Sequence, residues 1–344
     1  MKFKVLLELS IRTKGIVENK KSYYLPTKYD EITISDREII IEGERSNKVS
    51  FEDFKFNQNN GIHKQFLKSL LYLYFTRGNC FKIKKITFEQ GTKNIESSTI
   101  FKDDLNQLFI KPLNHKINSS VCERVFNYYS SNSQNKFFNA LSLFVIGLNN
   151  QDDFDPFWKA FNSIYNAISS KNQEKDKIKD ARMFIENNWD RMILCESRCN
   201  TITKDYIRNF SVREFIFSEF KKNANGSKEY SNMVCSFTDK RIIELFDDIK
   251  SYKNDLLLAH GYLNDVNNHI SNLIVHNILK NSDIIRFLIL KYAYYLRCKY
   301  FHAEKACANF VVKNTNDEKN LVNITSLLKT LLYDLLNCAD LYVI

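Results

Sequence analysis

Glycine and proline are scarce in this sequence, which has eight glycines and three prolines among its 344 residues. Both residues interrupt helices and form tight turns, so their scarcity predicts long helices joined by few turns. Hydrophobic residues make up 44% of the chain and aromatic residues 14%, which excludes an intrinsically disordered protein. We therefore expect a folded chain that is rich in helix.

Long apolar runs are also missing. No uncharged stretch reaches the roughly 18 residues that a membrane-spanning helix needs. No apolar run precedes a small-residue cleavage site at the start of the sequence, so we expect no secretory leader and no membrane partner. The eight cysteines are scattered along helical patterns. This arrangement predicts reduced thiols in a cytoplasmic protein.

Several motifs of common enzyme chemistry are absent. The sequence has no glycine-rich phosphate loop, no nucleophile elbow and no paired carboxylates for glycosidic or metal chemistry. The close pair Cys195 and Cys199 lacks a second pair or a histidine at zinc spacing. His269 and His276 lie two turns apart without an obvious third ligand, and we interpret them as packing or surface residues. We expect no metal and no cofactor.

The charge balance indicates the kind of partner. The formal net charge is +10 at pH 7, which favours an anionic partner, most commonly nucleic acid. A modest excess of lysine also improves solubility, so the alternative that the charge is incidental stays open.

The pattern of apolar residues changes from strand-like to helical near residue 112, so the predicted fold class is α+β. Residues 1–112 are expected to form a mixed strand-containing domain, whose role the sequence does not indicate. Residues 113–344 are expected to form a larger all-α bundle with a helical insertion at about 171–280. The clearest predicted elements are strands at 3–11, 32–42 and 81–88, a helix at 62–75, a helix opening at Asp155-Pro156, and a loop at 223–227.

The stretch Asp283–Lys305 stands out in the helical part. It begins as an almost completely apolar helix, which is typical of a helix buried among others. It then turns polar, with a cluster of titratable side chains: Arg297, Lys299, His302, Glu304 and Lys305. The pair Arg297 and His302 forms an R-x4-H pattern. This pattern is short enough to occur by chance, so its significance depends on the surrounding sequence.

Two segments together resemble the HEPN superfamily of helical ribonucleases and nucleotide-binding relatives. One is the aromatic segment FWKAFNSIY at 157–165, and the other is YYLRCKYFHAEK at 294–305. The second is similar to the R-x-x-x-F-H-x-x-K ending of the Apea-like branch, which occurs in bacterial proteins that defend against phage. In that branch asparagine commonly follows the arginine and glycine commonly follows the histidine, where this sequence has Cys298 and Ala303.

The resemblance implies metal-independent cleavage of RNA that leaves a 2′,3′-cyclic phosphate. An arginine binds a phosphate through planar bidentate hydrogen bonds, and a histidine moves protons near neutral pH. Five residues on a straight helix separate Arg297 and His302 by about 140° of rotation and about 7.5 Å of rise. One copy surrounds a phosphate poorly, whereas two copies across a two-fold axis would form a composite cleft. We therefore predict a homodimer, as in the family.

Neighbouring residues are expected to support this site. Lys299 and Lys305 are predicted to contact the RNA backbone, and Lys299 would also lower the pKa of His302. Glu304 is expected to hold Arg297 in place. Asn162, the polar residue within the aromatic helix, is a candidate to hydrogen-bond into the site, with an ordinary surface amide as the alternative.

Three functions stay open from the sequence. The first is a dimeric HEPN ribonuclease in anti-phage defence (abortive infection) or acting as a toxin, triggered by a phage-derived molecule or a nucleotide through the N-terminal domain. The second is a catalytically silent relative that binds RNA or nucleotides, which the residues Cys298 and Ala303 favour. The third is a structural or partner-binding helical protein.

Overall fold

The computed structural model describes residues 1–10, 17–35, 37–57, 60–127, 132–150, 153–301 and 315–343. The chain forms two compact units, Met1–Ser170 with Leu335–Ile344, and Lys171–Asp334. The boundary predicted between residues 112 and 113 falls inside the first unit. The second unit begins at residue 171, where the predicted helical insertion begins, and extends beyond the predicted end of that insertion.

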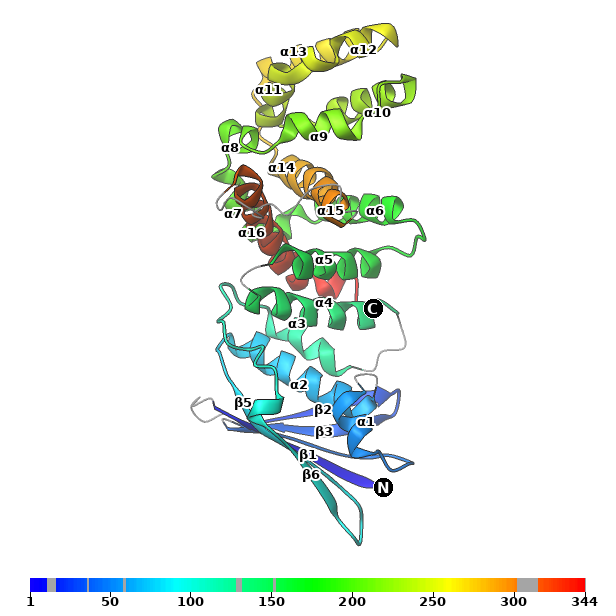
Figure 1. Ribbon diagram of the computed structural model, residues 1–344, viewed down its shortest axis with the longest axis vertical. Coiled ribbons are helices and arrows are strands. Elements are labelled where there is room, and N and C mark those ends of the chain that lie inside the picture. Colours follow the sequence, from blue (N-terminus) through cyan, green and yellow to red (C-terminus); the bar gives the residue numbers. More distant parts are fainter. Residues whose placement is uncertain are drawn as a thin grey trace. The chain divides into compact units, whose positions relative to one another are not determined.

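An antiparallel six-stranded sheet opens the first unit (Figure 1). Helices make up most of the remaining described chain, which confirms the predicted α+β class with an N-terminal strand-containing part. The strands lie in the order β2-β3-β4-β1-β5-β6. Their bounds are β1 (Lys2–Leu9), β2 (Glu18–Leu25), β3 (Lys28–Ile34), β4 (Glu38–Glu44), β5 (Ile83–Gln90) and β6 (Glu96–Phe101).

Alternation along the central strands gives the sheet one buried face. In β1, Phe3, Val5 and Leu7 are buried, while the residues between them are partly exposed. Val5 lies opposite Ile41 of β4 and Phe88 of β5, so apolar side chains of three strands form one layer. Helix α2 (Gly61–Arg77) packs across this sheet with α1 (Phe51–Phe56) beside it (Figure 1).

The strand predictions are correct for β1 and β5, merge β3 with β4, and miss the edge strands β2 and β6. The predicted strands at 3–11 and 81–88 correspond to β1 and β5. The single strand predicted at 32–42 is wrong, because β3 ends at Ile34 and β4 begins at Glu38 after a turn. The edge strands β2 and β6 are polar and half-covered, so they lack the apolar alternation that identified the central strands.

Helix α2 ends as its sequence predicts. Asn60 caps its N-terminus by accepting a hydrogen bond from the backbone of Ile62. Gly78 follows the last turn with a φ of 68°, a left-handed conformation that glycine adopts without strain. The remaining helices of this unit are α3 (Ser119–Glu123), α4 (Asn132–Asn149) and α5 (Phe154–Ile168).

Helix α5 carries the aromatic segment. Asp153, not Asp155, caps this helix, because its carboxylate accepts the backbone N–H of Asp155 at 3.4 Å. Phe157 and Phe161 are fully buried on the face toward α4. Gly147 of α4 permits this close packing, since a Cβ at that position would lie 2.8 Å from the Phe157 ring. The aromatic helix is therefore part of a packed core.

Lys68 of α2 is a buried cation whose removal is expected to stabilise the protein. Burial lowers the pKa of Lys68 from 10.5 to about 8, although Asp30 opposes this shift. Between pH 8 and 10.5 the unfolded chain therefore binds more protons than the folded one, so the free energy of unfolding rises with pH across this window. Below pH 8 the folded protein carries the full free-energy cost of burying the charge of Lys68. We expect Lys68→Met to raise the free energy of unfolding at pH 7 by up to about 3 kcal/mol.

Urea denaturation at pH 7 and pH 10 measures this effect. The gain from Lys68→Met should shrink at the higher pH, and the exposed control Lys28→Met should change little at either pH. A Lys68→Met protein that is less stable than the parent at pH 7 would contradict the assignment.

Helices are the only regular secondary structure in the described residues of the second unit. The predicted loop at 223–227 is wrong, because Asn223 caps a helix there by accepting the backbone N–H of Gly226 at 2.8 Å. The helices are α6 (Glu174–Asn187), α7 (Ile193–Asn200), α8 (Lys204–Arg208), α9 (Val212–Glu219), α10 (Ala224–Cys235), α11 (Lys240–Ile249), α12 (Asn254–Ala259), α13 (Leu263–His276), α14 (Asn281–Phe287), the π-helical segment η5 (Leu288–Ala293), α15 (Tyr294–Phe301) and α16 (Asn316–Asn337), whose last three residues belong to the first unit.

A buried ionic network joins α7, α11 and α14. The carboxylate of Asp239 caps α11 and accepts two hydrogen bonds from the Arg241 guanidinium, at 2.9 and 2.7 Å. Arg241 also donates to the carbonyl oxygen of Cys199 at 2.8 Å and to the side chain of Asn281 at 2.8 Å. Because Asp239 is completely buried, these hydrogen bonds compensate for the lost hydration of its charge.

Candidate functional site

The described part of the stretch that the sequence singled out, Asp283–Phe301, forms one continuous helical rod. Residues from Ser282 to Leu290 are all buried, which confirms the prediction of a buried helix. The rod passes from α14 through the π-helical segment η5 into α15. π-Helical turns are uncommon and are frequently found at functional sites, because an extra residue per turn changes where side chains point.

Arg297 lies on α15 beyond this buried part. Its side chain is 21% exposed, and its Nη1 atom is 4.0 Å from the Oε2 atom of Glu174 on α6. At this distance Glu174 attracts the guanidinium by its opposite charge. The sequence missed Glu174 because it lies more than a hundred positions from Arg297.

The other predicted site residues are only partly placed. His302, Glu304 and Lys305 lie outside the described residues. Lys299 is half-buried, with its ammonium 5.8 Å from the centre of the Tyr295 ring. Asn162 is half-buried in α5, and its side chain accepts a hydrogen bond from Asn166 one turn later. The roles of all these residues remain predictions.

Cys298 lies beside Tyr294. Burial raises the pKa of the Tyr294 hydroxyl to about 12, with further contributions from Cys298 and Glu174. Tyr294 therefore stays protonated at neutral pH and remains able to donate a hydrogen bond.

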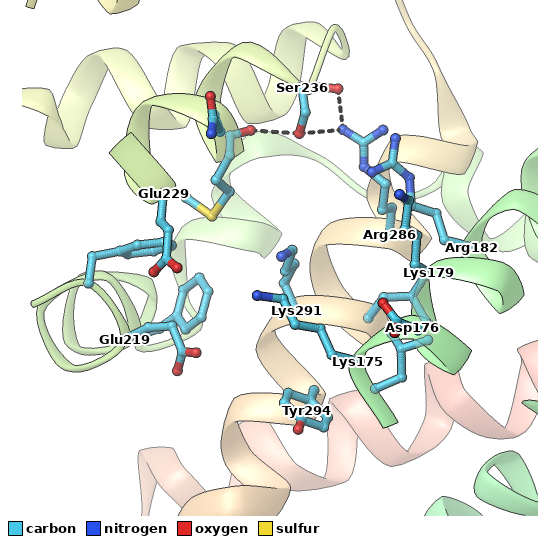
Figure 2. A pocket seen from close by; sticks show the side chains of 16 residues that line it. Lys175, Asp176, Lys179, Arg182, Glu219, Glu229, Ser236, Arg286, Lys291 and Tyr294 are labelled. Carbon is cyan, nitrogen blue, oxygen red and sulfur yellow. Dashed lines mark hydrogen bonds between the residues drawn. The ribbon is translucent and has the colours of Figure 1, made fainter. Parts of the chain in front are cut away.

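A cavity of about 660 Å³, which we call the α6 cavity, opens beside the same rod (Figure 2). Five cationic and three acidic side chains line it, together with apolar and aromatic groups. The cations are Lys175, Lys179 and Arg182 of α6, Arg286 of α14 and Lys291 of η5. The acids are Asp176, Glu219 and Glu229. Small-molecule sites in proteins commonly occupy about 300–1,000 Å³, and the α6 cavity falls in this range.

The rod supplies three of the lining side chains. Arg286 comes from α14, Lys291 comes from the π-helical segment η5, and Tyr294 is the first residue of α15. The basic spacing of Lys175, Lys179 and Arg182 along one face of α6 was the only sequence signal for this site.

Lys291 is the exposed residue within an otherwise buried part of the rod. Its side chain is accessible to water in the cavity, yet the cavity walls surround it with protein. This desolvation lowers the pKa of Lys291, as do the charges of Lys175, Arg182 and Arg286, while Glu219 opposes the shift.

Metal-binding and nucleophilic side chains are the remaining candidates for chemistry among the described residues. Among them, no group of three or more histidine, cysteine, aspartate or glutamate residues is arranged to hold a metal ion. Cys195 and Cys199 are buried in α7, and burial raises the pKa of the Cys199 thiol to about 12. A thiol with this pKa stays protonated and is a weak nucleophile at neutral pH.

Comparison with known proteins places the chain in no family, because no family model, curated protein or solved structure matches it. The described part of the chain contains no helix that is both long and apolar enough to cross a membrane.

Proposed function

We propose that this chain is a metal-independent endoribonuclease of HEPN type, acting as a cytoplasmic homodimer in anti-phage defence or as a toxin. Arg297 would hold the scissile phosphate and His302 would transfer the proton. The support is the R-x4-H pattern at the polar end of a buried helix, together with the aromatic helix α5.

The single observation that carries the proposal is the environment of Arg297. Its side chain is 21% exposed, so part of it can reach a ligand, and its Nη1 atom lies 4.0 Å from the carboxylate of Glu174. A partly exposed guanidinium on a helix suits charge-assisted binding of a phosphate. The net charge of +10 would favour approach of RNA.

Incubation of the purified protein with single-stranded and structured RNA in the presence of EDTA tests this proposal. We expect cleavage that EDTA does not prevent, with 2′,3′-cyclic phosphate ends detected by mass spectrometry of the fragments. Salt-sensitive RNA binding without cleavage would instead identify a silent binding relative. A lack of RNA affinity at low salt would leave a structural or partner-binding protein.

A further inference from the structure

The cations of the α6 cavity divide into two arginines that form ion pairs within the described fold and three lysines that do not. Arg182 pairs with Glu186 at 3.1 Å. Arg286 is almost fully buried, pairs with Asp283 at 3.3 Å and Glu186 at 3.1 Å, and donates to the backbone of Ser236. Lys175, Lys179 and Lys291, by contrast, form no ion pair with any residue that the structure describes.

These three lysines are therefore available to a bound anion. Lys175 and Lys291 reach into the middle of the cavity, and Lys179 and Arg182 stand along its α6 wall (Figure 2). Ammonium groups that converge on one enclosed space repel one another, and an anionic ligand would relieve this repulsion. A phosphate group accepts several charge-assisted hydrogen bonds, which matches several lysines around one point.

The opposite wall carries the opposite charge. Glu219 of α9 and Glu229 of α10 stand across the cavity from Arg182 and Arg286 (Figure 2). A polyanion such as RNA would place further phosphates near these carboxylates, at an electrostatic cost. A ligand with one phosphate and a neutral end that donates hydrogen bonds would instead satisfy both walls.

The rest of the lining fits such a neutral end. Phe215, Phe220 and Met233 contribute apolar surface, and Asn232 contributes an amide. Tyr294 adds a ring and a protonated hydroxyl. Apolar walls with a few polar groups are typical of sites for small organic molecules.

We propose that the α6 cavity binds a small phosphate monoester whose other end carries uncharged hydroxyl or N–H donors. Lys175, Lys179 and Lys291 bind the phosphate, and Glu219 and Glu229 accept hydrogen bonds from the neutral end. This binding does not depend on RNA cleavage, so either proposal can fail without the other.

Isothermal titration calorimetry of the full chain at low salt tests whether the α6 cavity binds a phosphate monoester. The probes are adenosine 5′-monophosphate, ribose 5-phosphate, inorganic phosphate and a short single-stranded RNA. We expect at least one of the two monoesters to bind more tightly than inorganic phosphate. Lys291→Met and Lys175→Met should each weaken that binding about tenfold or more, because each removes a charge-assisted hydrogen bond. The control Lys228→Met, an exposed lysine of α10 outside the cavity, should bind like the parent.

Three results would overturn the proposal. One is that neither monoester binds more tightly than inorganic phosphate. Another is that binding is unchanged in both Lys291→Met and Lys175→Met, with native folding verified by circular dichroism. The third is that RNA binds more tightly than either monoester and loses affinity in the same two variants, which would make the cavity part of a nucleic-acid surface.

Discussion

Replacing His302 with alanine is expected to reduce RNA cleavage at least about 100-fold, the usual contribution of a general acid or base. The proposed reaction needs a group that removes the proton of the 2′-hydroxyl and one that protonates the leaving 5′-oxygen. An imidazole does either near neutral pH, whereas alanine does neither. Initial rates on a fluorescent RNA substrate, with EDTA present, measure the loss.

Arg297 is expected to be equally important but through phosphate binding. Arg297→Ala should also lower the rate at least about 100-fold, because it removes the charge and the donor fork together. Arg297→Lys should lose most of this activity too, since a lysine keeps the charge but cannot form the bidentate pair.

Matched controls separate these effects from a general loss of structure or charge. His276 is exposed at the end of α13 and Arg208 is exposed at the end of α8, so His276→Ala and Arg208→Ala should retain the parent rate. RNA cleavage that persists unchanged in the His302→Ala protein would refute the proposed mechanism.

The proposed homodimer predicts a further result for the variants Arg297→Ala and His302→Ala. If each cleft uses residues of both copies, a mixed dimer of Arg297→Ala and His302→Ala chains keeps one intact arginine and one intact histidine. Co-purified mixed dimers, selected with two different tags, should then recover activity above either parent variant. A site contained within one chain would give no recovery.

The parts of the fold that the sequence predicts are those with strong local signals. β1 and β5 lie next to each other at the centre of the sheet and alternate clearly, and Gly78 marks the end of α2. The edge strands β2 and β6 need no apolar alternation, so their polar sequences gave no such signal. The helix α10 contains a glycine and two asparagines and has weak helix propensity, and packing against α13 stabilises it instead.

The residues of the candidate sites also differ in how far the sequence predicts them. Arg297 was found because its motif is local. The α6 cavity was missed because its lining comes from separate segments, from α6 to α15. A five-residue spacing such as Arg286 to Lys291 corresponds to about 140° on an α-helix, so it gives no sign that both residues line one cavity.

Arg241→Ala is expected to lower the free energy of unfolding of the second unit by about 3–5 kcal/mol, the typical cost of breaking a buried ion pair. Only 11% of the Arg241 side chain is exposed, and its removal leaves the buried carboxylate of Asp239 without a guanidinium. It also leaves the carbonyl oxygens of Cys199 and Ile202 without this donor. Urea denaturation followed by circular dichroism measures the change.

Two further variants distinguish an unpaired charge from a simple loss of contacts. The double variant Asp239→Asn with Arg241→Met leaves no charge unpaired in the interior, so it should be more stable than Arg241→Ala. Lys250→Ala breaks an ion pair with Asp247 of 2.7 Å between partly exposed side chains, and it should change the free energy of unfolding by less than about 1 kcal/mol. If Arg241→Ala cost no more than Lys250→Ala, the network would not hold α7, α11 and α14 together. In that case the ion pairs of Arg286 with Asp283 and Glu186, together with apolar packing, would hold α14 in place.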